Sequence, residues 1–202
     1  MRAGHLLLYV LLWQTTVNAS GLDAEEQHHA ADLAASLGWP AQIISIENHP
    51  LGLQTLSVEK QETKHSPGVR NARVYQYDYT RRAARVLVID LQTRRLIRTQ
   101  MIDSVHLPLN QAETDFARSL LRANEALLDK LRSEQLQRGQ PPFSSLEDLE
   151  LKASIFEPTD PDHPCATTRC ALLSLFDATR TVFSLEPVIF LNSQKIGLLQ
   201  HR

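Results

Sequence analysis

Two segments of the sequence repeat one pattern 100 positions apart, and this repeat constrains the fold more than any other feature. Residues 88–96 read VIDLQTRRL, and residues 188–196 read VIFLNSQKI. A second match precedes each copy, because residues 22–30 and 109–117 share the pattern Leu-Asp/Asn-x-x-Glu-x-x-x-Ala. A polar cap followed three residues later by Glu is typical of a helix start, and runs of Val, Ile and Leu are typical of strands. We therefore expect an α+β protein made of two related units.

Each unit is predicted to be one helix packed on an antiparallel meander sheet, which buries the apolar sides of both. The first helix is expected from its cap Asp23 to Leu37, and the second from Gln111 to about Leu136. Strands are expected in the first unit at 41–47, 53–58, 73–79, 85–91 and 95–102, with a polar loop at 59–68. Strands are expected in the second unit at 149–157, 170–176, 182–185 and 188–191.

The N-terminus has the features of a secretory signal peptide. Residues 6–13 form an unbroken apolar run, and Val17 and Ala19 are the small residues that signal peptidase accepts. Eight apolar residues span about 12 Å as a helix, too short for a membrane core of roughly 30 Å. We expect residues 1–19 to be removed, rather than kept as a membrane anchor. The mature protein would then be periplasmic or secreted, with no integral membrane segment.

The mature chain is long enough for two small domains, which we place at 20–107 and 108–202. Removal of Arg2 with the signal peptide leaves 20 basic against 23 acidic side chains. A nucleic-acid partner is therefore not expected, because phosphate binding needs a net basic face.

The two cysteines, Cys165 and Cys170, are expected to form a disulfide, because an exported chain meets an oxidising compartment. The segment 160–164 is rich in Pro and Asp, so it can turn and bring the two residues together. Closing so short a loop contributes about 2 kcal/mol. The alternatives are a pair of redox-active thiols and a metal-binding pair.

The order of helix and meander resembles the small cystatin-like N2 and N3 domains of copper amine oxidases. The likeness rests on residues 108–113 (Pro-Leu-Asn-x-x-Glu), similar to that family's Pro-Leu-Thr-x-x-Glu helix start, and on residues 88–91 (Val-Ile-Asp-Leu), similar to its Val-x-Asp-Leu strand core. In that family the chemistry belongs to a large separate domain with a Tyr-derived quinone and three His ligands to copper. A chain of 202 residues has no room for such a domain. The resemblance therefore implies a non-catalytic module without a cofactor.

Tyr75, Tyr77 and Tyr79 alternate along one predicted strand, so they and Arg73 share one face of its sheet. This face could be an aromatic platform that binds a partner side chain. The alternative is that it packs under the helix, with the hydroxyls at the rim.

Residues 70–98 contain eight arginines against two acids, whereas residues 101–162 hold twelve acids against six bases. This opposite charge could hold the two units together or attract an acidic ligand. The alternative is that the arginines lie in turns and are solvated.

No sequence motif of a known catalytic site occurs, and the adjacent His28 and His29 would point about 100° apart on a helix. The sequence therefore favours an exported, non-catalytic accessory protein that binds a protein or peptide through a sheet face or edge. The alternative is a small periplasmic hydrolase with dispersed catalytic residues.

Overall fold

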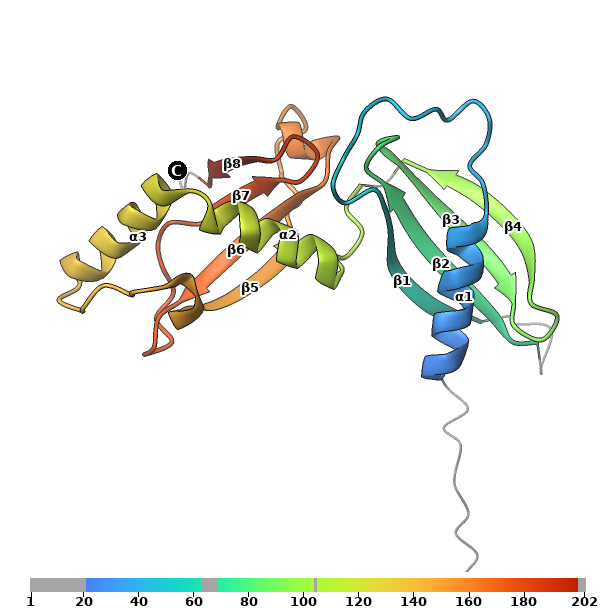
Figure 1. Cartoon of the computed structure of the whole chain (residues 1–202), viewed down its shortest axis with the longest axis horizontal. Helices are drawn as coiled ribbons and strands as arrows, with labels where there is room; N and C mark the ends of the chain where they lie inside the picture. The colour runs from blue at the N-terminus through green and yellow to red at the C-terminus, as the bar shows by residue number, and fades with distance from the viewer. Residues whose placement is uncertain (1–20, 63–68, 104, 200–202) are drawn as a thin grey trace, which may run out of the picture.

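The computed structural model describes residues 21–62, 69–103 and 105–199. The expected signal peptide, residues 1–19, lies outside the described residues. The described chain forms two four-stranded antiparallel sheets, each a simple meander with its strands in sequence order. Figure 1 shows the sheets side by side, with helix α1 on the first and helices α2 and α3 on the second. The α+β class and the two-sheet arrangement are therefore confirmed.

In the first unit, α1 lies across one face of its sheet (Figure 1). Asp23 and Glu26 form the predicted capping box at its start. The fully buried Ala30 and Ala34 let this helix approach closely to strand residues such as Val74 and Leu87. The elements of this unit are α1 (Ala24–Ser36), β1 (Leu53–Gln61), β2 (Asn71–Asp78), β3 (Ala83–Asp90) and β4 (Arg95–Ile102).

In the second unit, the helical segment is broken at Asn124, so the single long helix that we predicted is wrong. The Asn124 side chain accepts a hydrogen bond from the backbone N–H of Leu127 and starts a second helix. The apolar spacing continues through the break, which is why periodicity did not reveal it. The elements of this unit are α2 (Gln111–Arg122), α3 (Glu125–Gln137), β5 (Glu150–Ile155), β6 (Cys170–Phe176), β7 (Pro187–Phe190) and β8 (Lys195–Leu198).

The duplication inferred from the sequence holds at the level of hydrogen bonds. Leu91 and Leu191 both follow the third strand of their sheets, and each donates its N–H to the residue just before the second strand. These bonds are 2.9 Å long to the Arg70 carbonyl and 3.1 Å long to the Arg169 carbonyl. Leu91 and Leu191 therefore occupy equivalent positions, as predicted.

The turns of the two sheets repeat as well. Arg94 and Gln194, 100 positions apart, both adopt a positive φ, of 55° and 57°. The turns after β2 and β6 use the sequence Asp-x-Thr, in which Asp78 and Asp177 each accept bonds from the N–H and hydroxyl of the Thr two residues on. Each unit therefore closes its hairpins with the same local chemistry.

Two further predicted strands are wrong. Residues 41–47 pair with no strand among the described residues. Instead the N–H groups of Ile46 and Glu47 bond to the Thr80 carbonyl, and Ile46 is 58% exposed. In 182–185, only Val182 forms a β-bridge, because the N–H groups of Ser184 and Leu185 bond to the carboxylate of Glu134 on α3. The predicted start of the polar loop, at residue 59, is also wrong, because β1 continues to Gln61.

The two predicted units share one hydrophobic core. A single cluster of buried residues includes Leu56, Tyr77 and Tyr79 of the first unit together with Leu121 and Leu173 of the second. A separate cluster lies between α1 and its own sheet. The face of the first sheet that α1 leaves uncovered is therefore buried at one end by the second unit.

Candidate functional site

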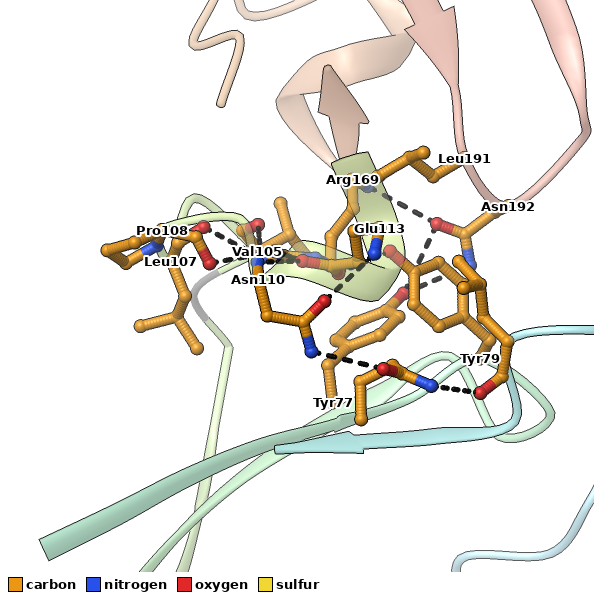
Figure 2. Close-up of polar contacts among 12 residues, drawn as sticks. Tyr77, Tyr79, Val105, Leu107, Pro108, Asn110, Glu113, Arg169, Leu191 and Asn192 are labelled. Atoms are coloured by element: carbon orange, nitrogen blue, oxygen red, sulfur yellow. Dashed lines mark hydrogen bonds and ion pairs between the residues drawn. The ribbon is translucent and has the colours of Figure 1, made fainter. Parts of the chain in front are cut away.

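A group of buried polar side chains lies where the two units meet (Figure 2). The side chains of Glu113 and Arg169 are both 0% exposed and form a bidentate ion pair, with two N–O distances of 2.9 Å. Glu113 also belongs to the capping box of α2 and accepts a 2.6 Å hydrogen bond from the Tyr79 hydroxyl. The Glu113 carboxylate therefore has hydrogen-bond donors on both oxygens, which offset the cost of burying its charge.

Arg169 also holds the segment that joins the units. Its guanidinium donates to the backbone carbonyls of Val105, Leu107 and Pro108, at 2.8, 3.0 and 3.2 Å. Nearly all of its donors are therefore used internally, and the connection between the sheets is fixed at the start of α2. This arrangement fixes the segment between the two sheets next to the second unit.

Further contacts cross the same boundary. The amide of Asn192, in the turn between β7 and β8, donates to the Tyr77 hydroxyl at 3.1 Å, and Asn110 donates to the side chain of Gln54 on β1 at 3.0 Å. The buried His49 contacts the carbonyl of Leu191 at 2.9 Å, and its ring stacks on Tyr79. Neutral hydrogen bonds and ring contacts therefore cross between the units. The Glu113–Arg169 ion pair lies within the second unit and contacts the first through the Tyr79 hydroxyl.

Burial raises the pKa of Tyr79 far above its usual value, and the neighbouring Glu113 carboxylate raises it further. Burial also raises the pKa of Tyr77. For Arg169, burial works to lower the pKa, but the Glu113 carboxylate outweighs it and the net shift is upward. The two phenols therefore stay protonated and the guanidinium stays charged near neutral pH.

The prediction that Tyr75, Tyr77 and Tyr79 form an exposed aromatic platform is wrong for Tyr77 and Tyr79. Tyr77 and Tyr79 are 1% and 0% exposed and form an edge-to-face pair inside the shared core. They do not pack under α1 either, because the helix covers the opposite face of the sheet. Arg73 and Tyr75, farther along the strand, are half-buried, and the Arg73 guanidinium lies 3.4 Å from the Tyr75 hydroxyl.

Seven of the eight arginines of residues 70–98 separate into two groups, and the eighth is the half-buried Arg73. Four have internal partners: Arg70 pairs with Glu26, Arg81 with Asp78 and Arg82 with Glu47, while the buried Arg85 donates to carbonyls at the end of α1. Arg94, Arg95 and Arg98 are exposed, and in the described ranges no ion pair to them is seen. Among the described residues, none of the arginines of 70–98 forms an ion pair with an acidic residue of 101–162. The units are thus not docked by opposite net charge.

The network contains residues that sequence reasoning missed, namely Arg169, Asn192 and His49. The repeat could have revealed Arg169, because it precedes β6 as Arg70 precedes β2. Each of these arginines binds the Glu of its own unit's capping box: Arg70 contacts Glu26 at 2.6 Å. Asn192 and His49 carry no comparable sequence signal, since they meet the other unit only after folding.

The expected disulfide is confirmed. Cys165 and Cys170 are bonded and fully buried, with their Cα atoms 5.7 Å apart. The bond holds the loop after β5 against the face of the second sheet that the helices leave uncovered, where it packs with Val188, Phe156 and Phe190. Within residues 21–62, 69–103 and 105–199, no three His, Cys, Asp or Glu side chains are grouped to hold a metal ion. No helix in these ranges is long and apolar enough to cross a membrane.

Several acidic side chains have a lowered pKa, and this lowering predicts how the stability of the protein depends on pH. The side-chain hydrogen bonds from Arg70 and Arg82 lower the pKa of Glu26 and Glu47, and that from Ser145 lowers the pKa of Glu147 to about 2. A lowered folded-state pKa stabilises the protein above the unfolded value and loses that effect as pH falls. We expect the urea midpoint to fall between pH 6 and pH 3, and to fall less in a Glu26→Gln/Glu47→Gln variant. A midpoint unchanged over this range would contradict the prediction.

Comparison with known proteins supports the fold. No family model and no curated protein matches the chain. A copper-containing benzylamine oxidase from Hansenula polymorpha has a similar structure, with a TM-score of 0.51 and 11% sequence identity. The match covers 89% of this chain but only 29% of that oxidase. At this identity the similarity establishes the fold alone, and it agrees with the resemblance seen in the sequence.

Proposed function

We propose that this is an exported, non-catalytic accessory protein that binds a protein or peptide partner on its first sheet. The observation that carries the proposal is the separation of its arginines. Arg70, Arg81, Arg82 and Arg85 have internal partners. Arg95 and Arg98 lie exposed on β4, and Arg94 in the turn before it, without an ion pair among the described residues. Exposed guanidinium groups bind carboxylates well, because their planar donors match both oxygens.

The strand register shows that residues of β2 lie on the same face of the sheet as an exposed arginine of β4. Arg73 on β2 pairs with Val88 on β3, which pairs with Arg98 on β4, so the two arginines lie in one row on the same face. Tyr75 lies in the next row on that face. We call Arg73, Tyr75 and Arg98 the arginine face, and we propose that it binds an acidic segment of the partner.

Two observations support an extracytoplasmic, non-catalytic role. The disulfide indicates an oxidising environment. The similarity to less than a third of an amine oxidase is consistent with tandem modules like its small N-terminal domains, separated from catalytic machinery. These observations support our proposal that the protein acts in the periplasm or outside the cell, with units at 20–107 and 108–202 that act as one binding body.

The test is recovery of a partner from native extracytoplasmic extract by immobilised mature protein. Arg73→Glu/Arg98→Glu should lower recovery of the partner at least tenfold, because each change replaces attraction to an acidic segment by repulsion. Added salt should also weaken the wild-type complex. Arg118→Glu/Arg180→Glu, with the same charge change in the second unit, is the matched control. Equal recovery by both double variants would contradict the proposal.

A further inference from the structure

The last strands of the two sheets, β4 and β8, each form an edge, and these two edges differ in how open they are to a further strand. β8 is the last strand of its sheet and pairs only with β7 among the described strands. Leu199 donates to the Glu186 carbonyl on the β7 side. Because inward and outward groups alternate along an antiparallel strand, the N–H and C=O groups of Ile196 and Leu198 face outward.

A hollow of about 590 Å³ lies on one side of β8, between this strand and the disulfide-closed loop. Its lining is apolar at the base, with Val188 and the Phe190 ring, and acidic at the loop, with Glu157 and Asp160. Gly197 makes this shape possible: a Cβ at this position would lie 3.1 Å from the Phe190 ring. The ring can therefore lie against the backbone of the edge strand.

Two more hollows lie on the other side of the same strand, next to the start of α3. They have volumes of about 270 and 470 Å³ and are bounded by Ile196 of β8 together with Asn124 and Ala126. Gly197 and Leu198 line hollows on both sides. The free edge of β8 is thus flanked by space above and below, in the positions that alternate side chains of a neighbouring strand would occupy.

We propose that an extended segment of a partner polypeptide binds along β8 as a fifth strand. Its backbone bonds to the outward groups of Ile196 and Leu198, and successive apolar side chains enter the hollows on alternate sides. The acidic rim at Glu157 and Asp160 favours a basic residue beside the side chain that enters the larger hollow. This surface lies on the second sheet and is independent of the arginine face.

The edge strand β4 shows why β8 is the better acceptor. β4 carries Arg95 and Arg98 and has a register irregularity opposite Val88 and Ile89. Charged side chains and bulges are the usual means by which proteins prevent strand addition at an edge. β8 has only Lys195 at its start and a glycine at its centre, so it presents little obstruction.

The test begins with a library of phage-displayed twelve-residue peptides selected on the mature, oxidised protein. Enriched peptides should contain alternating apolar residues with a neighbouring Lys or Arg. Leu198→Pro removes one outward N–H but leaves the bonds to β7, whereas Leu198→Ala removes only the side chain. We expect Leu198→Pro to weaken an enriched peptide at least tenfold and Leu198→Ala to weaken it much less. Circular dichroism and the intact disulfide verify that each variant is folded.

Amide hydrogen exchange locates the bound peptide. Binding should slow exchange at Ile196 and Leu198 more than at any β4 amide. The proposal is overturned if no peptide is enriched, if Leu198→Pro binds as tightly as wild type, or if protection appears on β4. Sedimentation of the mature protein gives the remaining outcome: a dimer that Leu198→Pro dissociates would assign the edge to a second copy of this chain instead.

Discussion

Replacing Glu113 by alanine is expected to lower the free energy of unfolding by about 3–5 kcal/mol, the usual cost of removing one partner from a buried ion pair. The variant leaves the Arg169 guanidinium without its counter-charge at a site where both side chains are 0% exposed. It also removes the acceptor of the Tyr79 hydroxyl and half of the capping box of α2. Urea denaturation of the mature protein measures the loss.

The duplicated unit supplies a matched control. Glu26 occupies the same position in the first unit, where it closes the capping box of α1 and pairs with Arg70. That pair is partly exposed, with 35% of the Arg70 side chain and 21% of the Glu26 side chain accessible. Glu26→Ala should therefore cost several-fold less than Glu113→Ala, since water can replace the lost partner. Equal losses in the two variants would show that burial does not set the strength of the pair.

Replacing Tyr79 by alanine should lower the free energy of unfolding by about 3–5 kcal/mol, as for other large aromatic residues removed from a core. The Tyr79 ring is fully buried, stacks on His49 and contacts Tyr77 in the cluster shared by both units. Tyr79→Phe should cost less, because the ring remains and Glu113 keeps its bonds to Arg169. Tyr75→Ala, on the same strand but half-buried, is the control for residue type.

The shared core also predicts that the two units of the wild-type protein unfold together. Trp39 is the sole tryptophan after residue 19, so its fluorescence reports on the first unit, whereas circular dichroism reports on both. If one core holds the units together, the two signals should change at the same urea concentration in wild type. Separate transitions, or a Tyr79→Ala variant as stable as wild type, would contradict the assignment of Tyr79 to a shared core.

The two Glu–Arg pairs show how one local motif lies in different surroundings in the two units. In each unit, an arginine just before the second strand binds the Glu of the helix cap. In the first unit the pair lies at the surface, whereas in the second it is enclosed by the neighbouring unit (Figure 2). The same local chemistry therefore ties a helix to its sheet in both units, and in the second unit the pair also contacts the first unit through the Tyr79 hydroxyl.

Local features of the sequence were sufficient to predict much of the fold. The caps at Asp23 and Asn110, the strands around Val88 and Val188, and the bond between Cys165 and Cys170 depend on residues close in the chain. Their hydrogen bonds form between groups only a few residues apart or within one hairpin, so composition and spacing carry the information. The repeat extended this local information to the architecture of both units.

The tertiary structure alone decided which surfaces are free. Alternation placed Tyr75, Tyr77 and Tyr79 on one face, but only the packing of the second unit determined that the last two are buried. The strand predicted at 41–47 is wrong because no strand of the described residues lies in position to pair with it. The hollows beside β8 likewise depend on a loop, a helix start and an edge strand that meet only in the folded chain. Burial and strand pairing are properties of contacts distant in sequence, and a local pattern does not encode them.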